Sequence, residues 1–204
     1  YMLEWEKANS IVKTLAQGKV AKLDRHITYF TDFYVKTNQI SKIDKLYDDF
    51  KLVKDEKNWH HLFMDGQISR ILENNDYATT QFKKSYKVCD NEIPGPGLYL
   101  CIHYIDLEKY DEASKILSET MENINHKTIA GMWLKHVDMF AKMLRGIISI
   151  KNNDLENAYV TMSEIRKIED VDDSNLFCLS GLYFILDNVD EGYKLIEEYI
   201  ESQG

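Results

Sequence analysis

The chain has 204 residues, enough to bury a full hydrophobic core as one domain or as one continuous solenoid. Two prolines and nine glycines are few, which is typical of a mostly helical protein with short turns. A formal net charge of −9 provides no long-range attraction for phosphate, so this chain is not expected to contact nucleic acid itself. No run approaches the roughly 18 apolar residues of a membrane span, and no secretory signal pattern opens the sequence. Its three widely spaced cysteines are typical of a reduced, cytoplasmic protein.

Apolar spacing predicts helices from end to end, with no strand pattern of comparable length. The predicted helices are 3–17, 20–36, one that starts near Ser41, one capped by Asn58, one from Asp76, and then 98–107, 110–124, 128–151, 155–168, 174–187 and 189–202. The first of them lacks a capping residue, so we expect a segment to be missing upstream, unless a tag was trimmed there or the start of the chain is disordered. Residues 91–97 hold both prolines and predict a loop between helical units, but not a domain boundary.

Four short polar stretches interrupt the helical pattern, and each contains one apolar residue: 74–78, 108–113, 153–158 and 187–192. Tyr77 and Tyr110 are 33 residues apart, and Leu155 and Val189 are 34 apart. A helix–turn–helix unit of about 34 residues is the tetratricopeptide period. From Tyr110 to Leu155 the distance is 45 residues, which predicts an insertion in one unit. The sequence therefore predicts a single all-α domain over 1–204, a tetratricopeptide-like right-handed superhelix of helical hairpins.

The unit around Gly146 fits the repeat best. Gly146 occupies the position of the consensus glycine, and Ala158 follows twelve residues later, where two helices cross closely. The first unit fits poorly, because Lys84 falls where an aliphatic residue belongs. The last unit, aligned on Gly181, is one residue short.

No pattern in the chain predicts catalysis, a metal or a cofactor. The neighbouring His60 and His61 would point about 100° apart on a helix and could not share a metal ion. His103 and Asp106 are three residues apart, a spacing that arises by chance in most helical proteins. We expect that the protein is not an enzyme.

The first helix of each tetratricopeptide unit supplies the concave surface, and in this chain those positions form an apolar stripe with a few polar points. Such a stripe suits a short peptide with apolar side chains, held by polar groups along its backbone. The same residues could instead be core between helix layers, and the sequence leaves both alternatives open. The candidate peptide-binding residues are Ile102, Ile105, Asp106, Phe140, Met143, Arg145, Ile147, Ile150, Lys151, Asn175, Leu182 and Ile185.

The layout of residues 30–202 resembles a known family, most clearly from residue 127 onward. The long helix 127–150, the turn 151–154, the helix to Lys167 and the hairpin that begins at 179–184 resemble the C-terminal region of the Rgg/GadR/MutR regulators of Gram-positive bacteria. The resemblance implies a domain that senses short peptide pheromones (quorum sensing) and dimerises, attached to a DNA-binding helix-turn-helix. No such motif is expected in this chain, so either the upstream domain was removed or the chain is a stand-alone relative.

The sequence thus leads to two functional expectations. The first is the peptide-sensing, homodimeric domain of a bacterial transcriptional regulator, in contact with DNA only through a domain outside this chain, and with no membrane partner. The apolar residues of the last helix (Tyr193, Leu195, Ile196, Tyr199 and Ile200) exceed what one inner face requires and support the dimer, although the helix could instead cap the end of a monomeric solenoid. The alternative is a tetratricopeptide adaptor that scaffolds other proteins and has no link to transcription.

Overall fold

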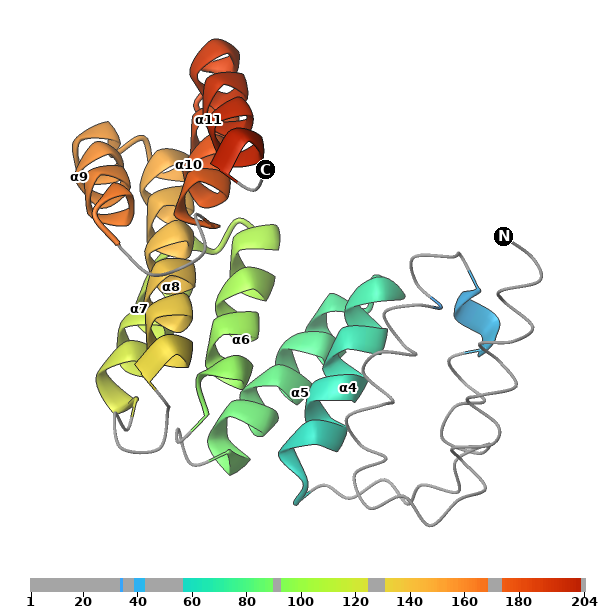
Figure 1. Ribbon diagram of the computed structural model, residues 1–204. Helices are drawn as coiled ribbons and strands as arrows, with labels where there is room; N and C mark the ends of the chain where they lie inside the picture. Colours follow the sequence, from blue (N-terminus) through green and yellow to red (C-terminus); the bar gives the residue numbers. More distant parts are fainter. Residues whose placement is uncertain are drawn as a thin grey trace. The chain divides into compact units, whose positions relative to one another are not determined.

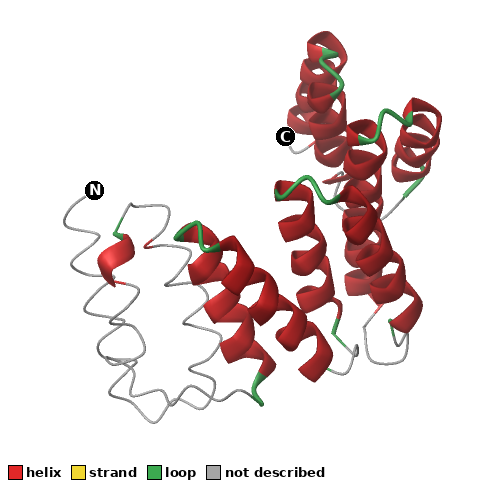
Figure 2. Ribbon diagram, turned by 180° about the vertical axis from the view of Figure 1, so that it is seen from behind, coloured by secondary structure: helices red, strands yellow, loops and turns green. Residues whose placement is uncertain are grey.

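A computed structural model of the protein describes residues 34, 39–42, 57–89, 93–124, 131–168 and 174–202. All regular secondary structure in these ranges is helical (Figures 1 and 2). The predicted helices 3–17 and 20–36 lie outside the described residues, apart from helical Tyr34, and near Ser41 only a short 3-10 helix, η1 (Ile40–Lys42), is described. The chain divides into two compact units, Tyr1–Val88 and Cys89–Gly204.

The described helices pair into hairpins. In the first unit α4 (Trp59–Ile71) pairs with α5 (Asn75–Val88). The second unit has three pairs: α6 (Pro94–Asp106) with α7 (Tyr110–Asn123), α8 (Gly131–Lys151) with α9 (Leu155–Arg166), and α10 (Ser174–Ile185) with α11 (Val189–Ser202). Within this unit α8 also packs on α6 and α7, and α10 on α8 and α9, so successive hairpins stack (Figure 1). The predicted all-α array of tetratricopeptide-like hairpins is confirmed.

Helix α6 begins earlier than the sequence suggests. It starts at Pro94, so the predicted loop 91–97 is wrong for its last four residues. Proline is tolerated in the first helical turn, where the missing N–H would have no intrahelical partner, and its fixed φ suits the helix. Two prolines in that turn are therefore a start signal here. The predicted cap at Asn58 is confirmed, because its side-chain oxygen accepts a hydrogen bond from the His60 N–H at 3.0 Å.

The four predicted turns are confirmed, and they share one backbone geometry. Glu73, Glu108, Asn153 and Asp187 all have φ between 58° and 59°, in the left-handed region. In each turn the next residue donates its N–H to a carbonyl five residues earlier, as Asn74 does to Ser69 at 2.8 Å and Asn188 does to Tyr183 at 2.9 Å. The left-handed residue itself donates three residues back. This is the Schellman motif, which satisfies the last carbonyls of a helix.

This common turn fixes the repeat register and corrects the prediction at both ends. Seven residues before each left-handed residue stands a small buried one: Gly66, Cys101, Gly146 and Ser180. Five residues after it stands another: Ala78, Ala113, Ala158 and Gly192. All four units thus keep the twelve-residue spacing. The first unit fits well once Ala78 is placed at the small position and Phe82, not Lys84, at the apolar position that follows it. The last unit is aligned on Ser180 instead of Gly181.

Close helix contacts explain the small residues at these positions. A Cβ atom on Gly66 would lie 2.7 Å from Phe82 Cδ1, and one on Gly146 would lie 3.0 Å from Leu182 Cδ1. By contrast, a Cβ atom on Gly181 would meet nothing within 4 Å. Gly181 therefore does not mark a close crossing, which is why alignment on it leaves the last unit one residue short.

The predicted insertion consists mostly of helix. α6 begins seven residues before Cys101, whereas α8 begins fifteen residues before the equivalent Gly146. The difference of eight residues accounts for most of the extra length between Glu108 and Asn153, and it adds about two turns to the start of α8.

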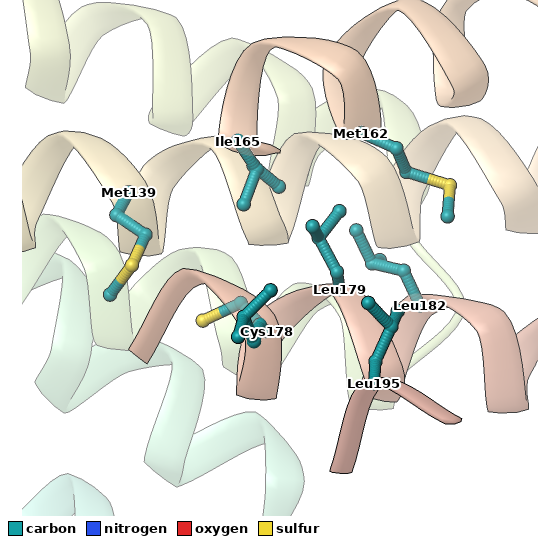
Figure 3. Close-up of a cluster of buried hydrophobic side chains, with 8 residues drawn as sticks. Met139, Met162, Ile165, Cys178, Leu179, Leu182 and Leu195 are labelled. Atoms are coloured by element: carbon teal, nitrogen blue, oxygen red, sulfur yellow. The ribbon is translucent and has the colours of Figure 1, made fainter. Parts of the chain in front are cut away.

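A hydrophobic cluster joins the last two hairpins. Its fully enclosed members come from α8, α9, α10 and α11: Met139, Met162, Ile165, Leu176, Cys178, Leu179, Leu182 and Leu195. Figure 3 shows Leu179, Leu182 and Leu195 close together beside Ile165. Since every helix of the two hairpins contributes to this cluster, the cluster holds the two hairpins together.

Candidate peptide-binding face

The candidate residues of the first helices differ in how far they reach solvent. Ile102 and Ile105 of α6 and Phe140 of α8 are half-buried, and Asp106 and Lys151 are exposed at the ends of those helices. These five residues offer apolar surface with one charge of each sign nearby. Together with Ile185 of α10, which is 38% exposed, and Arg145, which is also exposed, they are the predicted residues that remain available to a ligand.

Four other candidate residues are part of the hydrophobic core or pack against it. Leu182 is 0% exposed and lies inside the cluster of Figure 3. Met143, Ile147 and Ile150 are half-buried and pack against that cluster. For these four residues the core alternative describes the structure, because a side chain that already fills the interface between hairpins has little surface left for a peptide.

Asn175 has a local structural role. It is buried in the first turn of α10, where its amide donates to the carbonyl of Ile168 at 3.2 Å and its oxygen accepts from the Leu176 N–H at 2.9 Å. Because both ends of the side chain amide are used in this way, Asn175 anchors the start of α10 to the end of α9.

Arg145 lies apart from the other candidates. It lines a polar pocket of about 390 Å³ between α7, α8 and α9, and its guanidinium lies 3.9 Å from the carboxylate of Glu164. The pocket is lined by Ser114, Arg145, Ile148, Ser149, Asn152, Asp154, Asn157, Val160, Thr161 and Glu164. Of the predicted peptide-binding residues, this pocket contains Arg145 alone.

The corrected register adds residues that the sequence alignment missed. Counted from Ser180, the inner positions of α10 are held by Phe177, Gly181, Phe184 and Ile185, of which only Ile185 was predicted. Phe177 is 63% exposed, unusual for a phenylalanine within a repeat array. The twelve-residue spacing from Ser180 to Gly192 was the signal that would have found it.

The apolar residues of α11 differ in how far they are buried. Leu195 is enclosed in the core, and Tyr199 packs against it. Tyr193 and Ile200 are exposed, the latter by 63%, and Ile196 is half-buried. Leu195, at 0% exposure, therefore has no surface left for an interface, whereas the other four residues keep some.

Reactive chemistry has little support among the described residues. They contain no group of three or more histidine, cysteine or acidic side chains placed to hold a metal ion. Burial raises the pKa of the Cys101 thiol to about 12 and also raises the pKa of Cys178, so neither forms a thiolate near neutral pH. His103 is buried, while Asp106, three residues on, is exposed. No helix in the described ranges is both long and apolar enough to span a membrane.

Comparison with known proteins gives one informative likeness. No protein-family model matches the chain, and no curated protein matches it. The crystal structure of BtubC (BKLC) from P. vanneervenii is similar, with a TM-score of 0.61 over 88% of this chain and 79% of that one. At 12% identity the likeness shows the fold alone. This chain shares with that protein an all-α, helical-hairpin architecture.

Proposed function

We propose that this chain is a peptide-binding repeat domain that serves as the sensor of a bacterial, cytoplasmic transcriptional regulator. One observation carries the binding proposal: the inner positions of consecutive hairpins hold half-buried apolar residues (Ile102, Ile105 and Phe140) beside exposed charges (Asp106 and Lys151). Apolar side chains of a peptide would gain affinity by burial against the first group, and the charges would set its orientation. The link to transcription rests on the layout of residues 30–202, which resembles the Rgg/GadR/MutR regulators.

The proposed mechanism is a shift in population. Successive hairpins meet through a limited interface, so small changes in their packing alter the curvature of the stack. A peptide that binds one curvature more tightly than another shifts the equilibrium by its difference in affinity. In a regulator, this shift would change the geometry that a dimer presents to DNA.

The binding proposal can be tested with short synthetic peptides rich in leucine, isoleucine and phenylalanine, titrated into the full chain in a calorimeter. We expect Ile102→Glu to abolish binding and Lys151→Glu to weaken it about three- to tenfold, as rim charges do. Lys87→Glu is the matched control, because Lys87 also lies in the last turn of its helix, on α5. Circular dichroism should show unchanged helical content in all three variants.

The alternative is an adaptor that binds folded proteins. The exposed Phe177 and Ile200 favour it, because a peptide on the inner positions of α6 and α8 would leave both side chains in water. If no short peptide binds and a folded partner does, the sensor proposal fails and the adaptor takes its place.

A further inference from the structure

The last hairpin presents an apolar surface of the kind that elsewhere receives the next hairpin. The α10–α11 face consists of Phe177 and Phe184 of α10 with Ile196, Tyr199 and Ile200 of α11. The Phe177 and Tyr199 rings lie 6.3 Å apart, so they close one end of the face. At the other end Phe184 packs edge-on against Tyr193 at 5.3 Å.

The repeat register shows what this face is suited to hold. The equivalent positions of the preceding hairpin are Met143, Ile150, Met162, Ile165 and Arg166. The first four pack against the leucines of α10. The fifth, Arg166, reaches across to Glu198 of α11 at 3.9 Å. By equivalence, the α10–α11 face has the composition for one more helix, and among the described helices of this unit α11 packs extensively on α10 alone.

The charges beside the face indicate which helix would fit. Along the solvent side of α11, the exposed carboxylates of Asp190, Glu197 and Glu201 border Ile200 and Tyr193. Within the described residues no ion pair involves these three. Lys194, on the same side, lies 3.5 Å from Glu191. The flank is therefore acidic.

The corresponding flank of α9 is different. Thirty-four residues earlier in each case stand Glu156, Ser163 and Lys167, a set with no net charge. The helix that follows α9 in the stack, α10, has no acidic or basic residue of its own. An uncharged helix inside the stack is thus matched by a flank with no net charge, whereas the flank of the α10–α11 face is acidic.

A second copy of this chain does not fit the face. In an antiparallel, two-fold pairing of two α11 helices, the acidic flank of one would lie along the acidic flank of the other. Like charges brought together across an interface are unfavourable. We propose instead that the α10–α11 face docks an amphipathic helix of a partner protein, in which lysine or arginine residues flank the apolar stripe. Apolar anchors bind in the groove, and basic residues pair with the carboxylates.

The test uses two synthetic fluorescent peptides of about 18 residues, or five helical turns. Both carry the same leucine stripe at helical spacing, flanked in one by lysine and in the other by glutamate. Anisotropy titration into the full 204-residue chain should show the lysine peptide binding at least about tenfold more tightly at low salt. The difference should shrink as added salt screens the exposed charges.

Matched variants localise the binding. Glu197→Lys should reduce the preference for the lysine peptide about threefold or more, whereas Glu122→Lys, the same change at an exposed site on α7, should leave it unchanged. Ile200→Asp should weaken both peptides about tenfold or more. Ile200 is 63% exposed, so this change should leave helical content intact, as circular dichroism can verify.

Three results would overturn the proposal: equal affinity for the two peptides, affinity unaffected by Ile200→Asp, or a dimer that Ile200→Asp converts to monomer. The last would identify a second copy as the occupant. Ile102 lies in the proposed peptide-binding face on α6, so Ile102→Glu should not change binding of the lysine peptide. The two proposals can therefore fail independently.

Discussion

Four of the residues that the structure describes adopt a left-handed conformation that usually favours glycine, and none of them is glycine. Each lies directly after the C-cap residue of a helix: Glu73, Glu108, Asn153 and Asp187. An L-residue with a Cβ atom pays about 1–2 kcal/mol in this region, although asparagine and aspartate tolerate it better. The four turns therefore store unequal amounts of strain.

This inequality gives a prediction for single glycine substitutions. Glu108→Gly should raise the free energy of unfolding by about 0.5–1 kcal/mol, because relief of strain exceeds the entropy that glycine adds to the unfolded chain. Asn153→Gly should have an effect close to zero. Urea denaturation of the two variants measures the contrast, and an equal gain at both positions would argue against strain as the cause.

At the scale of helices, the hairpins depend on small residues where two helices cross. Ala158 is 0% exposed and lies twelve residues after Gly146, where an added Cβ atom would lie 3.0 Å from Leu182 Cδ1. Larger side chains at such points would force the helices apart.

Ala158→Leu should therefore destabilise the chain by about 1–3 kcal/mol through overpacking. Tyr159→Leu is the control next to it, since Tyr159 is 52% exposed and a surface change there should stay within about 0.5 kcal/mol. Denaturation midpoints compare the two. An unchanged midpoint for Ala158→Leu would mean that the crossing can open without cost.

The same scale shows what the sequence can predict and what it cannot. The turns were predictable, because polar residues at regular intervals break an otherwise continuous apolar periodicity. The start of α6 was not, because Pro94 and Pro96 signal a loop or a first helical turn equally well. In the candidate site, Ile147 and Leu182 were both plausible groove residues, because helix periodicity gives the face of a residue but not whether a neighbouring helix covers it.

For the whole molecule, the open question is its assembly. We propose a homodimer, as the resemblance to Rgg/GadR/MutR regulators implies, formed through a surface other than the acidic-flanked α10–α11 face. Sedimentation equilibrium at micromolar concentration should give about twice the chain mass of 24.0 kDa. Ile200→Asp should leave that mass unchanged, and a mass of one chain for the unmodified protein would contradict the dimer.

The shared turn geometry has a consequence for how the chain acquires its structure. Each hairpin closes over three residues, so its two helices meet at a small cost in loop entropy before any distant segment takes part. Most pairings in the second unit join neighbours in sequence, which is the condition for rapid folding. Ordering can begin at any hairpin and spread to the next, in the manner of a one-dimensional chain of coupled units. The weakest coupling between neighbours, rather than the sum of all contacts, then decides where such a chain first opens.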